Sequence, residues 1–191
     1  FYGPISQFRT AEAEKFNFPF LEEILNYIEC NKQSTPVVII IYYEFFKLHY
    51  TKDLKYYYSL KGSLAEIGDA IDYTEKRNIY LALASILSDM TIEGNISVYG
   101  EYFETQLSNI RNGYLNTASG YLSAQQFRNM VIFLTSRLKD YDKADKFIEE
   151  YKTRLEPNVQ ISNYYFCKSV VEFNKKNWDL ALESLSKVLA Y

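Results

Sequence analysis

The sequence predicts an all-α protein built from antiparallel helix pairs, and three observations support this fold class. Seven Gly and four Pro among 191 residues are few, so the chain lacks the turn chemistry of a sheet protein. Apolar residues recur every three or four positions along most of the chain, as in amphipathic helices. Two short stretches, 139–144 and 176–181, have the composition of one tight turn between two helices.

The composition excludes several classes of protein. With 48% hydrophobic and 24% charged residues, the chain belongs with soluble globular proteins and not with disordered ones. A formal net charge of −3 provides no positive field, so nucleic acid is not expected as a partner. No apolar run approaches the ~20 residues of a membrane helix, so we expect no membrane insertion. Cys30 and Cys167 match no metal or redox spacing and are expected to be two buried, reduced thiols.

The two ends of the chain have little pattern of their own. Residues 1–17 have no clear period and are expected to form an extended lead-in to a single helical-repeat domain over residues 18–191. The chain begins at Phe1 without Met or a leader and ends at Tyr191 within an apparent helix, so we expect a piece of a longer protein. A cytoplasmic location is the default expectation for such a piece.

The first helices follow from periodicity, with one local conflict. Residues 19–31 place apolar side chains on a single helical stripe and predict a helix. Pro36 is a start signal, but the β-branched run 37–41 after it prefers a strand by itself. We predict a helix here, because the segment continues to Tyr50, beyond usual strand length, and no partner strand is evident. Being apolar on all sides, it should lie between other helices.

Three further helices are expected before the middle of the chain. Thr51 is the expected cap of the first, which runs to about Gly68. Thr74 opens the second, in which small and large apolar residues alternate, and 93–95 ends it. Residues 96–112 form the third.

A long break in the helical pattern follows at 112–122, and it is either a connection between repeats or an exposed functional loop. Ser123 and Gln126 then have the spacing of a capping box, which predicts the start of a new helix. Its apolar stripe consists of Phe127, Met130, Val131, Leu134 and Leu138.

The two tight turns align together with the helices that follow them. A small residue suits the point where two helices cross, because it lets the backbones approach closely, and Pro157 stops the first of the two aligned helices. The alignment pairs Tyr141 with Trp178, Asp142 with Asp179, Ala144 with Ala181, Ile148 with Leu185, and Tyr151 with Val188.

This arrangement resembles the tetratricopeptide repeat, whose second helix has an aromatic residue at the turn, a small residue at the crossing and a large apolar residue four positions later. The resemblance implies a right-handed α-solenoid, with the clearest repeats at 123–157 and 160–191. Another α-solenoid and an irregular helical bundle are the alternatives.

The match to this family is partial. Ala181 follows Ala144 by 37 positions (181 − 144), whereas the family period is 34, so the connection after Pro157 should be about one turn longer. The first helices fit poorly, since the family's small residue falls on Ile132 in one copy and on Ser169 in the other.

The resemblance implies a non-catalytic protein–protein interaction or assembly scaffold, which binds a partner's peptide or helix in a concave groove. In the family, the first helices of successive pairs line this groove. A specialised chaperone-binding role is not expected, because that role needs polar groups where this chain has Phe133, Phe166 and Val170. These three residues could instead pack against neighbouring helices. The positions that match the groove are Gln126, Asn129, Phe133, Arg137, Asn163, Phe166, Val170 and Asn174.

No pattern of catalysis, of a cofactor site or of a metal site is present in the sequence. His49 has no His or Cys near it in sequence to complete a metal site, and the paired carboxylates suit solvated helix faces. We therefore expect no enzyme and no cofactor. One alternative is an accessory domain of a larger enzyme; the other is a small-ligand or glycan-binding domain with tyrosine platforms, which an enclosed pocket lined by Tyr56, Tyr57, Tyr99 and Tyr102 would favour.

Overall fold

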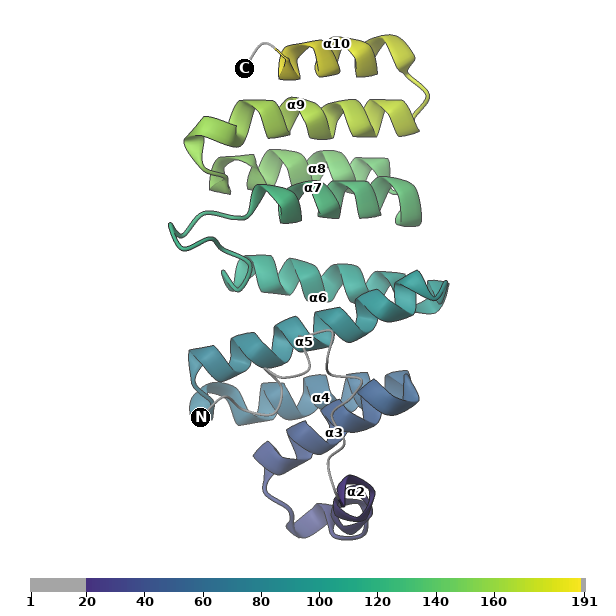
Figure 1. Ribbon diagram of the computed structural model, residues 1–191, viewed down its shortest axis with the longest axis vertical. Helices are drawn as coiled ribbons and strands as arrows, with labels where there is room; N and C mark the ends of the chain where they lie inside the picture. Colours follow the sequence, from purple (N-terminus) through teal and green to yellow (C-terminus); the bar gives the residue numbers. More distant parts are fainter. Residues whose placement is uncertain (1–19, 190–191) are drawn as a thin grey trace. The chain divides into compact units, whose positions relative to one another are not determined.

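The computed structural model of the chain describes residues 20–189 (Figure 1). Within this range, helices account for the regular structure and no β-strand is present, which confirms the predicted all-α class. The predicted lead-in 1–17 lies outside the described residues. The chain divides into two compact units, an N-terminal unit that ends at Asn95 and a C-terminal unit that begins at Ile96, and each is described by itself.

Nine α-helices are found among the described residues. The N-terminal unit contains α2 (Leu21–Cys30), α3 (Val37–Thr51), α4 (Leu54–Ile67) and α5 (Tyr73–Ile92). The C-terminal unit contains α6 (Tyr99–Arg111), α7 (Ala124–Phe133), α8 (Tyr141–Tyr151), α9 (Pro157–Asn174) and α10 (Trp178–Val188).

The segment with conflicting signals, α3, is a helix, as predicted. It packs against α2, α4 and α5, so most of its circumference is covered, although Val38 and Ile39 remain partly exposed. Apolar contact on several sides outweighs the local preference of β-branched residues for a strand. The buried side chains of α3 are Ile40, Ile41, Tyr43, Glu44, Phe45, Phe46 and Leu48.

A buried carboxylate, Glu44, joins α3 to α4. Ser63 donates a hydrogen bond of 2.9 Å to its Oε2, and Ser59 donates one to its Oε1. The Lys32 Nζ lies 3.5 Å from Oε1 and partly balances the charge. Because a charge is buried in proteins only with such partners, this cluster fixes how the two helices face each other.

Two predicted helix starts were wrong by one or two residues, and aspartate explains both. Thr51 is the last residue of α3, and Asp53 caps α4 by accepting a hydrogen bond of 2.9 Å from the backbone N–H of Lys55. Asp72 caps α5 in the same way, so this helix begins just before the expected Thr74. A carboxylate is a strong acceptor for the free N–H groups of a first turn.

Three details of the C-terminal unit also differ from expectation. Ser123 occupies the cap position of α7, but its side chain makes no capping hydrogen bond, so the predicted capping box with Gln126 is wrong. The segment expected as one helix from residue 96 begins with a 3₁₀ turn, Ile96–Val98. Pro157 does not stop α8, which ends at Tyr151; it opens α9, where its missing N–H is tolerated.

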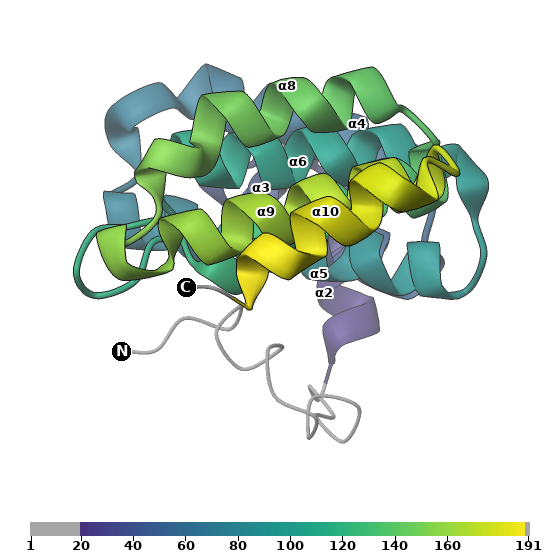
Figure 2. The same cartoon turned by 90° about the horizontal axis from the view of Figure 1, so that it is seen from above.

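The helices of the C-terminal unit pack in sequence order. α9 lies against α7 and α8 on one side and against α10 on the other (Figure 1). Seen from above, the axes of α8, α9 and α10 are closely aligned (Figure 2). The predicted break after α6 is a series of turns with one isolated bridge between Asn116 and Leu122. The buried core of this unit includes Phe127, Val131, Ala144, Phe147, Ile148, Cys167 and Val171.

The two aligned turns share a backbone conformation. Lys139 and Lys176 have left-handed φ angles of 54° and 66°, and they precede Asp140 and Asn177 at the cap positions. Lys52, at the turn between α3 and α4, repeats this conformation with a φ of 56° and is also followed by a capping aspartate. The same turn therefore joins three helix pairs of the chain.

An ion-pair network joins α8 to α9. Both carboxylate oxygens of Asp145 accept hydrogen bonds of 2.8 Å, one from Lys168 and one from Lys175. Lys168 also lies 3.3 Å from Glu149. Burial raises the pKa of Asp145, but the hydrogen bonds from the two lysines outweigh it and leave the pKa below its ordinary value.

We expect Asp145→Asn to lower the free energy of unfolding at pH 7 by about 1 kcal/mol, a small value because these charges are partly screened by solvent. The pKa of Asp145 is lower in the folded protein than in the unfolded chain, so its charge stabilises the fold at any pH above the unfolded pKa of about 4. This stabilisation is lost as the pH falls through the pKa of the folded protein. Urea unfolding at pH 7 and at about pH 2.5 measures this. The difference in free energy of unfolding between wild type and Asp145→Asn should shrink at the lower pH. A difference as large as at pH 7 would contradict an electrostatic origin.

Candidate functional site

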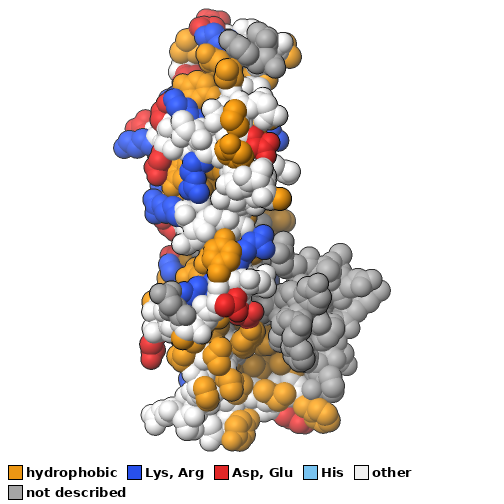
Figure 3. All heavy atoms as spheres, turned by 90° about the vertical axis from the view of Figure 1, so that its left-hand side faces the viewer, with side chains coloured by type: hydrophobic (Ala, Val, Ile, Leu, Met, Phe, Trp, Pro, Cys, Tyr) orange, Lys and Arg blue, Asp and Glu red, His pale blue; other side chains and the backbone are white. Residues whose placement is uncertain are grey.

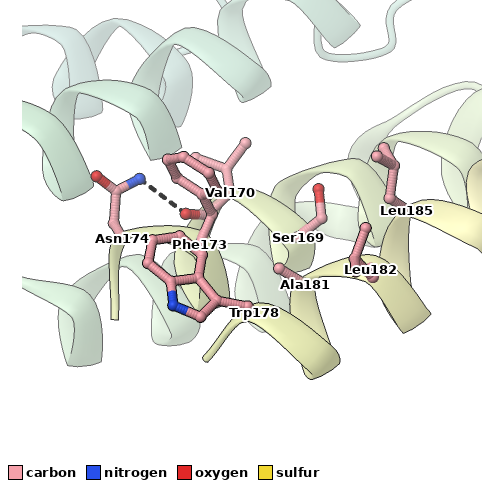
Figure 4. A pocket seen from close by; sticks show the side chains of 8 residues that line it. All are labelled: Ser169, Val170, Phe173, Asn174, Trp178, Ala181, Leu182 and Leu185. Atoms are coloured by element: carbon pink, nitrogen blue, oxygen red, sulfur yellow. Dashed lines mark hydrogen bonds between the residues drawn. The ribbon is translucent and has the colours of Figure 1, made fainter. Parts of the chain in front are cut away.

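An open apolar hollow lies between α9 and α10, with a volume of about 410 Å³. Figure 4 shows that α9 and α10 both contribute side chains to it. None of its lining residues is charged. We call it the α9–α10 hollow, and its lining residues are Ser169, Val170, Phe173, Asn174, Trp178, Ala181, Leu182 and Leu185.

The sequence of α10 explains why the hollow forms. Ala181 is buried at the contact with α9, so the two helices approach closely there. Trp178, Leu182 and Leu185 follow at steps of four and three residues and so form a second stripe beside this contact. Their exposed fractions are 52%, 65% and 43%, although each is a large apolar side chain. The described residues therefore leave an apolar face of α10 uncovered.

One end of the hollow is aromatic. The rings of Phe173 and Trp178 pack edge to face with centroids 5.0 Å apart, and 60% of Phe173 is exposed. This pair joins the two helices, as the close view shows (Figure 4). Exposed aromatic pairs of this kind offer a large, rigid contact area to a partner.

The two polar residues of the hollow bond to their own helix. The Asn174 side-chain amide donates a hydrogen bond of 2.8 Å to the Val170 carbonyl, and the Ser169 hydroxyl donates one of 2.7 Å to the Phe166 carbonyl. The hollow thus presents carbon surface and few donors. It is suited to apolar groups and poorly suited to a sugar or a charged small molecule.

Only two of the eight residues predicted for the groove, Val170 and Asn174, line the hollow. On α7, Gln126 is half-buried and Asn129 is exposed, and Arg137 is exposed in the π-helical turn that follows α7. Phe133 packs edge to face against the rings of Tyr99 and Tyr102 of α6, with ring centroids 5.6 and 4.7 Å apart.

The other two predicted residues take part in the contact between α7 and α9. Asn163 is buried; its Oδ1 accepts a hydrogen bond of 2.6 Å from Arg128, and its amide donates one of 2.7 Å to the Val159 carbonyl. The Arg128 guanidinium also lies over the ring of Phe166, 5.9 Å from its centroid. Asn163 and Phe166 therefore position α9 on α7.

Most of the hollow was not predicted from the sequence. The alignment paired Leu185 with Ile148 as large apolar residues, but Ile148 is fully buried whereas 43% of Leu185 is exposed. The stripe formed by Trp178, Leu182 and Leu185 was visible at helical spacing. Periodicity identifies an apolar face but does not show whether another helix covers it.

The tyrosines proposed as a ligand platform are largely inaccessible. Tyr57 is fully buried in the N-terminal unit, and Tyr99 is buried in the C-terminal unit. Tyr102 packs against Phe133, and the Lys55 ammonium lies over the ring of Tyr56. These four rings therefore take part in packing, which does not favour the glycan-binding alternative.

A second exposed apolar surface is found in the N-terminal unit, where hydrophobic side chains gather over α2 and α3 (Figure 3). Phe20, Ile24 and Tyr27 are among its exposed members. Residues 1–19 directly precede it in the chain and lie outside the described range. We therefore assign no site there.

The two cysteines and the histidine have different surroundings in the described part of the chain. Cys30 is exposed, so the prediction of two buried thiols was wrong for it. Burial raises the pKa of Cys167 to about 12, which keeps its thiol protonated and unreactive. Burial also lowers the pKa of the half-buried His49. Across residues 20–189, no three His, Cys, Asp or Glu side chains are grouped to hold a metal ion.

None of the helices in the described part of the chain combines the length and hydropathy needed to cross a bilayer. Comparisons with protein-family models, with curated proteins and with solved structures find no match to this chain. The physical character of the hollow is therefore the basis for a functional assignment: it is open, uncharged and aromatic at one end.

Proposed function

We propose that this chain is a protein-interaction or assembly module, a tetratricopeptide-like right-handed α-solenoid that acts without catalysis or a cofactor. The repeated lysine turn, with the same left-handed backbone before α4, α8 and α10, supports the repeat character. The packing of α9 across both α7 and α8 is the kind of contact that stacks helix pairs in such a fold. In this proposal, the partner is a protein segment that docks in the α9–α10 hollow.

The exposure of the hollow is the observation on which this function depends. Single exposed apolar residues are common on protein surfaces and need no explanation. Here Phe173, Trp178, Leu182 and Leu185 are all exposed and line one hollow. In this proposal the contiguous apolar patch is the site for another protein, because leaving it in water is unfavourable.

Two residues predicted for the family groove offer a polar surface in addition to the hollow. Asn129 and Arg137 are exposed, and Asn174 lines the hollow itself. In this proposal, exposed amides and the guanidinium hydrogen-bond the rim of the docked segment, while the hollow receives its apolar side chains.

Affinity capture from the source cell tests the proposal. We expect Leu185→Asp to reduce the captured partner at least tenfold, because a carboxylate placed in the hollow must lose its water. Glu183→Gln is the matched control: Glu183 is exposed on the same helix but does not line the hollow, so capture should persist. Circular dichroism should show equal helical content in both variants.

Undiminished capture by Leu185→Asp would refute docking in the hollow. A second variant, Arg137→Glu with Asn129→Asp, tests the polar surface separately, because both residues are exposed and neither lines the hollow. If it alone reduces capture, the partner binds the first-helix surface and not the hollow.

A further inference from the structure

Arg128 of α7 is a half-buried cation, and no carboxylate among residues 20–189 lies within ion-pair distance of it. Its guanidinium donates a hydrogen bond of 2.6 Å to the Oδ1 of Asn163 and lies over the ring of Phe166, 5.9 Å from the centroid. Both of these neighbours are uncharged. A guanidinium has five N–H donors, and the bond to Asn163 uses one of them.

Lysines of the same unit differ from Arg128, because they have carboxylate partners. Lys168 and Lys175 donate hydrogen bonds to Asp145, and Lys152 donates one to Glu149. Their charges are therefore balanced within the chain. The charge of Arg128 is available to an anion from outside the described residues.

The guanidinium of Arg128 is also held in one orientation. Asn163 is only 5% exposed, and its amide donates a hydrogen bond of 2.7 Å to the Val159 carbonyl, which fixes its Oδ1 toward Arg128. The ring of Phe166 supports the guanidinium by a cation–π contact. A guanidinium positioned in advance loses little conformational freedom on binding, and its planar fork matches the two oxygens of a carboxylate.

The neighbours of Arg128 on α7 favour a protein segment as the source of the anion. Gln125 and Ile132 lie three residues before and four residues after Arg128, on the same helix face, and both are exposed. Gln125 offers an amide for hydrogen bonds, and Ile132 offers an apolar contact. A segment with a carboxylate beside an apolar side chain could use all three residues, whereas a small free acid would use Arg128 alone.

We infer that Arg128 binds a carboxylate of a partner protein and that Asn163 is its positioning residue. This inference rests on the proposed function for the presence of a protein partner, but it does not require that the partner also occupies the hollow. Arg128 is not among the positions that the sequence predicted for the groove. The carboxylate belongs either to an acidic side chain or to the end of the partner chain, which have the same chemistry.

The side-chain Nε–H signals of the arginines test the site in nuclear magnetic resonance spectra of the full chain labelled with nitrogen-15. Arg128→Lys identifies the Arg128 signal by its loss. Sodium acetate is the probe, exchanged for sodium chloride so that screening stays constant. Arg154 is the internal control, because its guanidinium also lies over a ring, 5.7 Å from the Tyr151 centroid, but no buried amide holds it among the described residues.

We expect the Arg128 signal to respond at an acetate concentration about fivefold lower than the Arg154 signal, because only Arg128 is positioned in advance. An equal response of the two signals would overturn the inference.

Three short peptides distinguish the two sources of the carboxylate. The first alternates glutamate with leucine and is capped at both ends; the second has glutamine in place of glutamate; the third is the glutamine peptide with a free C-terminal carboxylate. Binding of the first about tenfold tighter than the second identifies an acidic side chain, and the same advantage of the third identifies a chain end. If neither binds more tightly than the second, the inference is overturned.

Two variants connect peptide binding to the site. Arg128→Gln should weaken the better carboxylate peptide about tenfold, whereas Arg154→Gln, which removes the same charge elsewhere in the unit, should leave its binding unchanged. Asn163→Asp should also weaken it, because the new carboxylate pairs with Arg128 within the chain and keeps α7 in contact with α9, although the bond to Val159 is lost. Circular dichroism should show wild-type helical content, and wild-type binding by both site variants would refute the site.

The outcomes separate this inference from the proposed function. If Leu185→Asp abolishes partner capture while no carboxylate probe moves the Arg128 signal, the Arg128 site is refuted and docking in the hollow stands. If Arg128 responds as expected while Leu185→Asp captures the partner undiminished, docking in the hollow is refuted and the Arg128 site stands.

Discussion

Replacing Ala144 with Phe is expected to lower the free energy of unfolding by about 3 kcal/mol, at the upper end of the usual cost of overpacking. Ala144 is fully buried in α8 and belongs to the core cluster shared with α7 and α9. A ring at this position forces neighbouring helices apart, because the core has no space for the added atoms. Urea unfolding followed by circular dichroism measures the change.

Ala181→Phe is the matched control, since Ala181 has the same position in α10 but lines the open hollow. Ala181 is buried against α9, but its methyl group also borders the hollow, so part of the ring can extend into it and we expect a smaller loss than for Ala144→Phe, about 1 kcal/mol. Equal destabilisation by the two variants would show that the two alanines have the same surroundings, contrary to the structure.

Glu44→Ala is expected to lower the free energy of unfolding by about 2 kcal/mol. The change removes a buried carboxylate that accepts hydrogen bonds from Ser59 and Ser63 and pairs with Lys32, and it leaves a cavity between α3 and α4. Thermal and urea unfolding of the variant measure the loss.

Glu44→Gln separates hydrogen bonding from charge. The amide keeps the shape and one acceptor oxygen, so we expect a loss of about 1 kcal/mol, between wild type and Glu44→Ala. The contribution of Lys32 should be small, because 40% of its side chain is exposed. If the alanine variant proves as stable as the wild type, the cost of burying the carboxylate cancels its hydrogen bonds, as occurs for some buried ion pairs.

α8 and α10 are similar in sequence position and length but have different surroundings. α8 and α10 share the same turn, the same alanine and the same length. Asp145 in α8 bonds to lysines within the chain, whereas Leu182 in α10 is exposed and lines the hollow.

Periodicity predicted the helices well but their starts less well. The stripes of α2 and α7 and the length of the α3 segment were sufficient to identify helices, because these signals extend over several turns. The starts of α4 and α5 were displaced because threonine and aspartate can both cap, and the choice depends on which side chain reaches the free N–H groups. Pro157 was assigned to the wrong helix because it is compatible both with the end of one helix and with the start of the next.

By itself, the sequence determined the all-α class, the repeated turn and the small residues at two helix contacts, since these depend on local spacing and side-chain size. Only the tertiary structure decided which apolar faces are covered. Ile148 and Leu185 have the same chemistry and the same repeat position, yet one is buried and the other lines a hollow. The reason is physical: burial is a property of the neighbouring helices in space, and α9 covers α8 whereas no described helix covers the equivalent face of α10.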